Sequence, residues 1–421
     1  MPTATPSPLP SRFHRLAWSN LAAQSAEQIG LAAAPMVAVL TLGAGPGETG
    51  LLAAAQTLPF LLLSFPAGML ADRTPRRRLM ALAEAARMVA LLALPVLALL
   101  GLLSVPLLAA LGFAAATGTV AFSVAAPALV PALVPREALA AANGRLELAR
   151  SVAFAGGPAL AGALVGWAGT STAFTLAGAL SGLAVLLLIG VPEPPRPALP
   201  PRHPLHDVRE GARFAFTHHL LRPILLTGVV WNVAWFVLQA AYVPYAVQRL
   251  GLTATGIGIT LAAYGAGMVT GALLAPRVAR RMSFGMSVAM GPIVSVLAAG
   301  AMVATILLPT PLLAGLGFFL FGAGPILWTI SQTTLRQTVT PAAMLGRVSA
   351  LFLMALTGAR PLGAAIGAAV GSGHGPAACL VLAAAGFLAQ AGIILCSPVP
   401  RLARLSDADR LPCQERACGA S

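Results

Sequence analysis

The stretch AGMLADRTPRRRLM, residues 67–80, places a short, densely charged bend between two long apolar runs. Asp72 and four arginines fall within residues 72–78, although only 9% of the whole chain is charged. Each flanking run is long and apolar enough to cross a bilayer as a helix, which would leave the bend at the membrane surface. The stretch therefore predicts a helical membrane protein with a basic loop between its second and third spans.

The rest of the chain has the composition of a protein that crosses the membrane many times. Its 421 residues are 58% hydrophobic, mean hydropathy is +0.85, and the 43 glycines suit helices that pack closely in lipid. About twelve apolar spans of about 20 or more residues are long enough to cross a core of about 30 Å. They cover residues 17–42, 49–71, 79–100, 103–131, 141–167, 172–191, 223–248, 254–276, 285–308, 311–334, 344–370 and 375–397.

Arginine placement predicts the orientation of these spans. The net charge of +14 would suggest a nucleic-acid partner in a soluble protein, but here the basic residues fall in alternate loops and in both terminal segments. Arg249 is the exception. Because basic residues collect in cytoplasmic loops, both termini are expected in the cytoplasm and the span count is even. We predict a multi-pass protein of the bacterial cytoplasmic membrane that binds no nucleic acid.

A proline-rich loop at residues 192–222 divides the chain into halves of similar size. The predicted units are a six-helix bundle (1–191), a cytoplasmic linker (192–222), a second bundle (223–398) and a cytoplasmic tail (399–421). Residues 142–166 and 344–371 resemble each other, with Gly144-Arg145 answered by Gly346-Arg347. Two repeated six-helix bundles are the plan of a transporter whose halves rock about a central site.

Acidic residues within the spans are candidates for proton coupling, since a charge in the membrane is costly unless it is functional or paired. Residues 211–406 contain no Asp or Glu, so a coupling carboxylate must lie in the first half. Glu27 lies about ten residues into the first span. There it could take up a proton on one side of the membrane and release it on the other. A structural acid paired with an arginine or a hydroxyl is the alternative.

Two further acid–arginine pairs lie in the spans of the first half. Glu84 with Arg87, and Glu147 with Arg150, have the i,i+3 spacing that places both groups on one helix face. Local pairing makes a buried acid less costly and harder to protonate, which favours a structural role. Glu147 and Arg150 remain coupling candidates, because Arg150 could change partners as the halves move.

A second set of polar and aromatic residues could face a central cavity. Their 3–4 spacing places several of them on one stripe of the seventh span. Aromatic walls with a few hydrogen-bonding groups suit bulky amphipathic ligands, although an interfacial aromatic belt explains the same residues. Arg360 has no acid nearby in the sequence and could bind an anionic substrate group or helix-end carbonyls. The predicted substrate-cavity residues are Asn232, Trp235, Gln239, Tyr242, Trp328, Gln332 and Arg360.

Motifs for nucleotide binding and for metal binding are missing from the sequence. The chain has no G-x-x-x-x-G-K-[ST] loop and no lysine, which excludes ATP-driven transport by this chain alone. Neither the six histidines nor the four cysteines have metal-ligand spacing, so no cofactor and no metal are predicted.

Two of these segments resemble signatures of the major facilitator superfamily. GMLADRTPRRR is similar to its loop between helices two and three, with matches at Gly68, Asp72, Arg73, Arg77 and Arg78 and with Pro75 in place of a glycine. GGPALAG (156–162) resembles the fifth-helix antiporter motif of exporters, with matches at Gly157, Pro158 and Gly162. In this chain the motif could form a tight seal or a flexing point.

The resemblance covers essentially the whole chain and is greatest to bacterial drug, macrolide and enterobactin exporters. It implies a twelve-helix facilitator fold in two pseudo-symmetric bundles and proton-driven export of drugs, secondary metabolites or siderophores by a monomer. The basic motif that many drug antiporters carry on the fourth helix is missing, because residues 103–131 contain no arginine. A facilitator-type nutrient importer is the alternative, and a non-transporting sensor or enzyme is a more distant one.

The charged bend itself raises a question of local structure. Thr74 could cap the third helix and Pro75 could occupy its first turn. Asp72 could then serve as a latch to a helix of the other half or only as a helix cap.

Overall fold

The computed structural model describes residues 11–134, 139–193, 204–341 and 344–403, and these residues form thirteen α-helices and one short 3-10 helix. The seventh α-helix, α7 (Pro204–Thr217), has 14 residues, and the other twelve have 20–30. The twelve long helices are α1 (Ser11–Leu40), α2 (Pro46–Arg73), α3 (Arg76–Leu99), α4 (Val105–Leu133), α5 (Leu139–Ala168), α6 (Thr170–Ile189), α8 (Leu221–Gln248), α9 (Ala254–Arg281), α10 (Phe284–Ala304), α11 (Pro311–Val339), α12 (Leu345–His374) and α13 (Pro376–Leu395).

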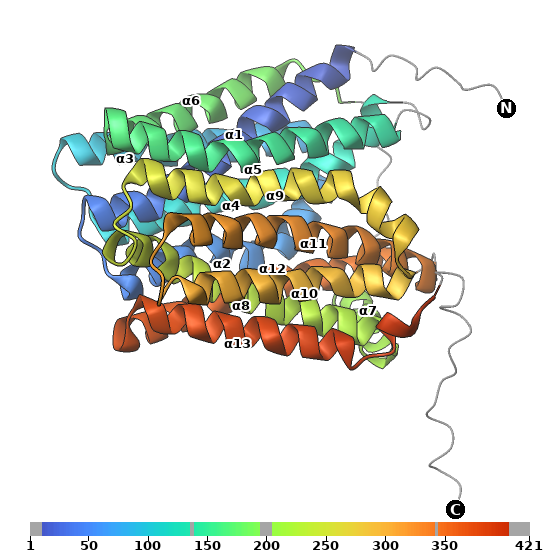
Figure 1. Cartoon of the computed structure of the whole chain (residues 1–421). Coiled ribbons are helices and arrows are strands. Elements are labelled where there is room, and N and C mark those ends of the chain that lie inside the picture. Colours follow the sequence, from blue (N-terminus) through green and yellow to red (C-terminus); the bar gives the residue numbers. More distant parts are fainter. Residues whose placement is uncertain (1–10, 135–138, 194–203, 342–343, 404–421) are drawn as a thin grey trace, which may run out of the picture.

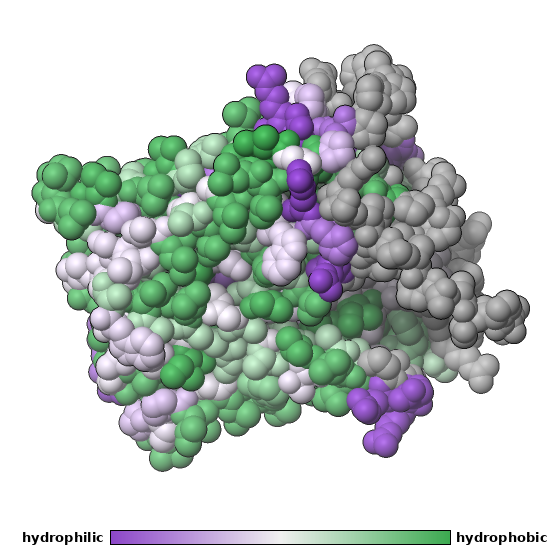
Figure 2. All heavy atoms as spheres, turned by 90° about the horizontal axis from the view of Figure 1, so that it is seen from above, coloured by the Kyte–Doolittle hydropathy of each residue, from purple (hydrophilic) through white to green (hydrophobic). Residues whose placement is uncertain are grey.

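These long helices correspond to the twelve predicted spans. At about 1.5 Å per residue, even a helix of about 20 residues covers the hydrocarbon core. Within the described residues, ten of them (α3–α6 and α8–α13) are both long and apolar enough to cross a membrane. Many large apolar side chains point outward, with Leu99 83% and Leu307 85% exposed. Figure 2 shows apolar residues over much of the visible face and hydrophilic ones gathered mainly toward one end. The fold is therefore that of an all-α membrane protein.

The helices lie side by side and nearly parallel, in two bundles (Figure 1). The first comprises α1–α6 and the second α8–α13, and they meet where α2 packs on α12 and α5 packs on α9. The start of α1 and the end of α13 lie at the same end of the molecule. We call it the arginine-rich end, because Arg15, Arg77, Arg78, Arg281 and Arg347 lie at the helix ends there.

The charged bend of residues 67–80 joins α2 to α3, and a distant carboxylate caps it. Glu193 accepts hydrogen bonds from the backbone N–H groups of Arg76 (2.8 Å) and Arg77 (2.9 Å) at the start of α3. The prediction that Thr74 caps this helix is wrong, since its hydroxyl donates to the carbonyl of Leu70 at the end of α2 (2.6 Å). A charged acceptor at a helix N-terminus also interacts favourably with the helix dipole.

Two arginines at this end bind the last carbonyl groups of α6. Arg77 Nη1 donates to the carbonyls of Ile189 and Val191, both at 3.3 Å, and Arg15 Nη1 donates to Gly190 (3.1 Å). Cations at a helix C-terminus satisfy its free carbonyls and complement its dipole. The basic residues of this end thus join α1, α3 and α6, in addition to any role in orienting the chain.

Removing the Glu193 cap should destabilise the first bundle. Glu193→Ala leaves the two N–H groups of α3 without this acceptor, and the loss of a helix cap costs about 1 kcal/mol. We expect a lower thermal unfolding midpoint in detergent. Arg78→Gln, an exposed neighbour in the same turn, serves as the control and should unfold at the wild-type temperature. Equal midpoints for Glu193→Ala and the wild type would contradict the capping role.

The linker helix α7 packs on the second bundle. Glu210 on α7 forms an ion pair with Arg347 at the start of α12. Ala215 is fully buried in a cluster that includes Leu221 of α8 and Phe352 of α12. Through these contacts α7 extends the second bundle at the arginine-rich end.

The two bundles approach closely at the end opposite the arginines. A Cβ atom at Gly50 of α2 would lie 2.6 Å from the Cα atom of Ala368 in α12. Nearby, the Thr49 hydroxyl donates to the carbonyl of Ala240 in α8 (2.8 Å). Backbone contact of this kind needs small residues and closes this end on the α2–α12 side.

Candidate functional site

A cavity of about 480 Å³ lies between the two bundles. The first bundle contributes residues of α1, α2 and α5, and the second contributes residues of all six of its long helices. Its volume falls in the range of about 300–1,000 Å³ typical of small-molecule sites. The cavity lies at the interface of the repeated bundles, where a substrate site is expected in a rocking architecture.

The second bundle lines the cavity with stacked aromatic rings. Trp231 and Trp235 on α8 stack with ring centroids 5.4 Å apart. Trp235 also contacts Tyr264 of α9 (5.0 Å) and Phe321 of α11 (5.2 Å). The indole N–H of Trp231 donates to the hydroxyl of Ser295 in α10 (3.1 Å). Ring contacts among three helices, and this hydrogen bond to a fourth, hold the wall in one arrangement, so it offers a flat apolar surface to a ligand.

Six of the seven predicted substrate-cavity residues line this cavity: Asn232, Trp235, Gln239, Trp328, Gln332 and Arg360. Tyr242 does not, which corrects the prediction. Its side chain is fully buried, its hydroxyl hydrogen-bonds to Thr260 of α9, and the ring of Phe318 packs at 4.5 Å. The 3–4 spacing places Tyr242 on the same stripe as Asn232, but α9 and α11 cover that stripe at the level of Tyr242.

Several lining residues were not predicted as site residues from the sequence. They are Gln28, Gln56, Phe154, Trp231, Tyr264, Ser295, Phe318 and Gln390. Gln28, Gln56, Gln390 and Tyr264 are polar groups within apolar spans, which is a usable signal. Phe154 and Phe318 carry no such signal, because an aromatic residue in an apolar helix suits a core equally well.

Glu27 of α1 lines the cavity from the first bundle. Among the described residues, the positive charges that act on its carboxylate are those of Arg87, Arg360 and Arg150, and Glu84 is the acid nearby. No hydrogen bond from a described residue holds the carboxylate. The predicted alternative of an acid tied to one structural partner is therefore not the arrangement found in this part of the chain.

Arg360 of α12 lines the same cavity as Glu27, from the second bundle. Its guanidinium carbon lies 5.6 Å from the ring centroid of Phe60 in α2 and 5.8 Å from that of Phe236 in α8. Its Nε atom donates to the Asn232 side-chain oxygen (3.4 Å). Aromatic faces can hold a guanidinium group while leaving most of its donors free. Arg360 is thus placed to receive an anion or the carboxylate of Glu27.

The second acid–arginine pair lies at the edge of the site. Arg150 and Glu147 form an ion pair of 2.6 Å, with side chains 40% and 55% exposed. Arg150 lines the cavity and lies over the ring of Phe154 (5.7 Å), whereas Glu147 is not among the lining residues. Glu147 is thus connected to the cavity only through Arg150, and a coupling role for this pair stays a prediction.

Comparison with known proteins agrees with this architecture. The model of one protein family, the transmembrane secretion effectors of the major facilitator superfamily, matches residues 3–417. The chain belongs to this family. It is 32% identical over 314 residues to the enterobactin exporter EntS of Citrobacter koseri, covering 73% of this chain and 72% of the relative. It is 31% identical over 312 residues to EntS of Escherichia coli O157:H7, with the same coverage.

Solved structures of other transporters share the fold. A bacterial homologue of the iron transporter ferroportin, in its inward-facing state, superposes with a TM-score of 0.72 at 18% identity, covering 92% of this chain and 99% of the other. The nucleoside transporter NupG gives 0.73 at 11% identity, with the same coverage. The transporter described here therefore has the major facilitator fold. Its described residues include no group of three or more His, Cys, Asp or Glu placed to hold a metal ion.

In this transporter, the GGPALAG motif forms the contact between α5 and α9. A Cβ atom at Gly162 would lie 2.5 Å from the carbonyl oxygen of Ala254 and 2.8 Å from the Cα atom of Gly258. A Cβ atom at Gly258 would meet the carbonyl of Pro158 at 2.6 Å. Gly157 abuts Gln28 of α1 within its own bundle. Of the two predicted roles, a tight seal fits these contacts.

The signature loop of the transporter is only partly described. Gly68 lies within α2, but the side chains of Asp72 and Arg73 lie outside the described part of the chain, so the choice between latch and cap for Asp72 stays a prediction. Arg77 binds the end of α6, and Arg78 is exposed.

Proposed function

We propose that this transporter exports a siderophore or a related aromatic secondary metabolite in exchange for protons. The observation that carries the proposal is the composition of the cavity wall, to which the first bundle contributes Glu27 and the second contributes Arg360 and the aromatic residues. The enterobactin exporters among its relatives support the substrate class, and the antiporter motif supports the direction.

The proposed mechanism is alternating access. The halves rock about the cavity, and protonation of Glu27 changes which state is favoured. With Glu27 ionised, its carboxylate can accept hydrogen bonds from donor groups of the cargo, while Arg360 and the aromatic wall bind the remaining polar and apolar parts. A proton on Glu27 removes the negative charge that attracts these donors. Binding of the proton and binding of the substrate then compete, as exchange requires.

The driving force is adequate for useful export. One proton that crosses the membrane supplies about 2.3 kcal/mol per 100 mV, before any pH gradient. Since about 1.4 kcal/mol is a tenfold ratio, one proton at 100 mV supports roughly a 50-fold gradient of a neutral substrate. We place the protein in the cytoplasmic membrane as a monomer, with the arginine-rich end and both termini in the cytoplasm.

Everted membrane vesicles test the proposal. Vesicles that contain the protein should accumulate enterobactin, or a member of a panel of aromatic metabolites and drugs, when respiration acidifies their interior. A protonophore should abolish accumulation, and vesicles without the protein should show none. Accumulation that survives the protonophore would contradict proton coupling. Equilibration without accumulation in energised vesicles would instead support a facilitator.

A further inference from the structure

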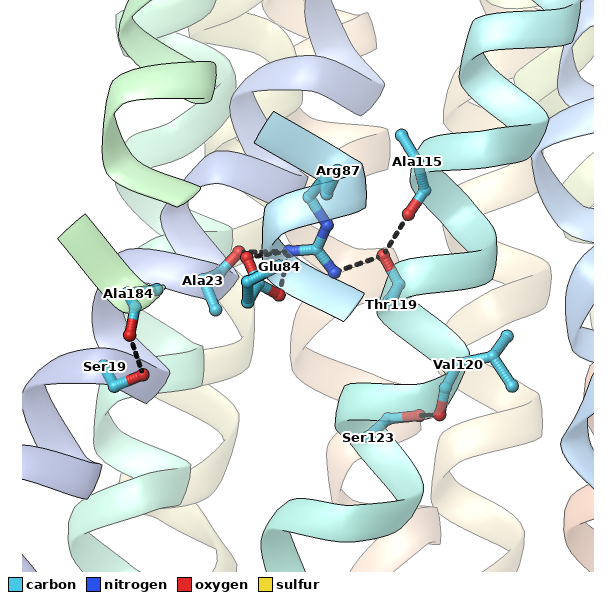
Figure 3. A network of polar contacts seen from close by, with 9 residues as sticks. All are labelled: Ser19, Ala23, Glu84, Arg87, Ala115, Thr119, Val120, Ser123 and Ala184. Carbon is cyan, nitrogen blue, oxygen red and sulfur yellow. Dashed lines mark hydrogen bonds and ion pairs between the residues drawn. The ribbon is translucent and has the colours of Figure 1, made fainter. Parts of the chain in front are cut away.

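A buried charge cluster lies behind the cavity, within the first bundle (Figure 3). Glu84 and Arg87 on α3 form an ion pair of 3.0 Å, with side chains 0% and 2% exposed. Arg87 Nη1 also donates to the carbonyl of Ala23 in α1 (3.0 Å), and Nη2 donates to the hydroxyl of Thr119 in α4 (2.6 Å). These hydrogen bonds fix the guanidinium group between three helices of one bundle.

A small pocket joins this cluster to Glu27. It has a volume of about 50 Å³, and both Glu27 and Arg87 line it, together with Gln56 and Thr119. Glu27 lies one helical turn beyond Ala23, the residue whose carbonyl binds Arg87. A water molecule takes up about 30 Å³ in the liquid, so the pocket has room for one between the two side chains. The Nε atom of Arg87 is buried and has no hydrogen-bond partner among the described residues.

The cluster has a polarity relative to Glu27. Arg87 lines the small pocket together with Glu27, whereas Glu84 does not, so the pair presents its positive end to the cavity acid. A buried ion pair contributes little to stability compared with apolar residues of the same volume. The pair is better explained by its effect on Glu27. It holds a fixed positive charge beside a carboxylate that no described residue hydrogen-bonds.

Arg87 and Arg360 differ in what happens to them when the halves rock. Arg360 belongs to the second bundle, and its distance from Glu27 changes with the state of the transporter. Arg87 belongs to the same bundle as Glu27 and moves with it. We propose that Arg87 is a positioning residue, the permanent counter-charge that keeps the ionised form of Glu27 tolerable in the membrane after Arg360 has moved away. The inference rests on the proposed proton-coupled export.

Neutralising the whole pair tests this role without leaving Glu84 as an uncompensated charge. In the full-length transporter reconstituted in vesicles, Glu84→Gln with Arg87→Gln should lower proton-driven turnover at least about tenfold, with the substrate concentration for half-maximal rate within about twofold of wild type. The pH profile of turnover should also be displaced. Ser19→Ala, which removes a buried hydrogen bond from α1 to Ala184 in α6, is the structural control and should keep the wild-type profile.

Two further variants separate a charge effect from loss of packing. Arg87→Lys retains the positive charge but loses the forked hydrogen bonds, and should restore much of the turnover. In a Glu27→Gln background, neutralising the pair should cause no further loss of proton coupling, because both changes act through one carboxylate.

The results that would overturn the proposal are distinct from those that concern the proposed function. Wild-type coupling and an unchanged pH profile in the pair variant would overturn it. So would an Arg87→Lys variant as defective as the pair variant, or losses that add to that of Glu27→Gln. If the wild-type protein accumulates substrate without any need for protons, the proposed function itself fails and the inference fails with it.

Discussion

Replacing Gly162 by leucine should abolish most transport, because no side chain fits between α5 and α9. A Cβ atom at this position already lies 2.5 Å from the carbonyl oxygen of Ala254, which belongs to the other bundle. Overpacking of a tight contact costs about 1–3 kcal/mol. Since about 1.4 kcal/mol changes an equilibrium tenfold, the state in which α5 and α9 are in contact at Gly162 should become at least several-fold rarer. Turnover in vesicles should fall about tenfold or more, with expression unchanged.

The same motif supplies a matched control. Gly156 has nothing within 4 Å of an added Cβ atom and is exposed on the outer face of α5. Gly156→Leu should therefore transport at close to the wild-type rate. Gly258→Leu, on the facing helix, should reproduce the defect of Gly162→Leu, and the double variant should be little worse than either. Normal turnover in Gly162→Leu would show that this contact is not needed in the transport cycle.

Replacing Glu27 by glutamine should uncouple transport from the proton gradient. Glutamine keeps the size and polarity of the side chain but cannot take up or release a proton in the physiological range. Proton-driven accumulation in everted vesicles should fall at least about tenfold, while substrate binding measured without a gradient stays within about twofold. We expect this difference because the substrate is surrounded by many lining residues, of which Glu27 is only one. For the proton, Glu27 is the one acid among the described residues that line the cavity.

Glu147→Gln is the control for this prediction. Glu147 lies in the same bundle, but it is 55% exposed and outside the cavity lining. Its variant should accumulate substrate as the wild type does. Full proton-driven accumulation by Glu27→Gln would remove Glu27 from the mechanism. A loss in Glu147→Gln instead would return coupling to the Glu147–Arg150 pair.

The predicted site residues show that a sequence pattern alone does not decide which side chains of a helix line the cavity. Asn232 and Tyr242 share a stripe of α8, yet Asn232 lines the cavity and Tyr242 is buried against Thr260 and Phe318. In a soluble helix, the apolar face would show which side is covered. A helix in lipid is apolar on nearly all sides, so its sequence indicates little about which side faces a neighbour.

The GGPALAG motif and the charged bend show a related limit, because their contact partners lie far away in the sequence. The glycines of the motif indicate a close approach, but Gly258, which meets Gly162, lies 96 residues further along the chain. The bend indicates a helix start that needs a cap, and the nearby Thr74 is a reasonable candidate from its position. The cap is instead Glu193, 117 residues from Arg76. Local propensity cannot identify such a partner, because a long-range contact depends on how the helices pack.

The sequence alone determined the features that follow from the membrane as a solvent. Apolar runs of spanning length set the number of helices, and alternating arginines together with a repeated segment indicate two similar halves. The tertiary structure alone decided which side chains meet in the cavity. It placed Glu27 and Arg360 in the wall of one cavity, placed Arg87 and Glu27 in the wall of a small pocket, and left Glu147 outside the cavity lining. The physical reason is that span length and loop charge are properties of one segment in the bilayer, whereas cavity contacts depend on packing among helices that lipid does not orient.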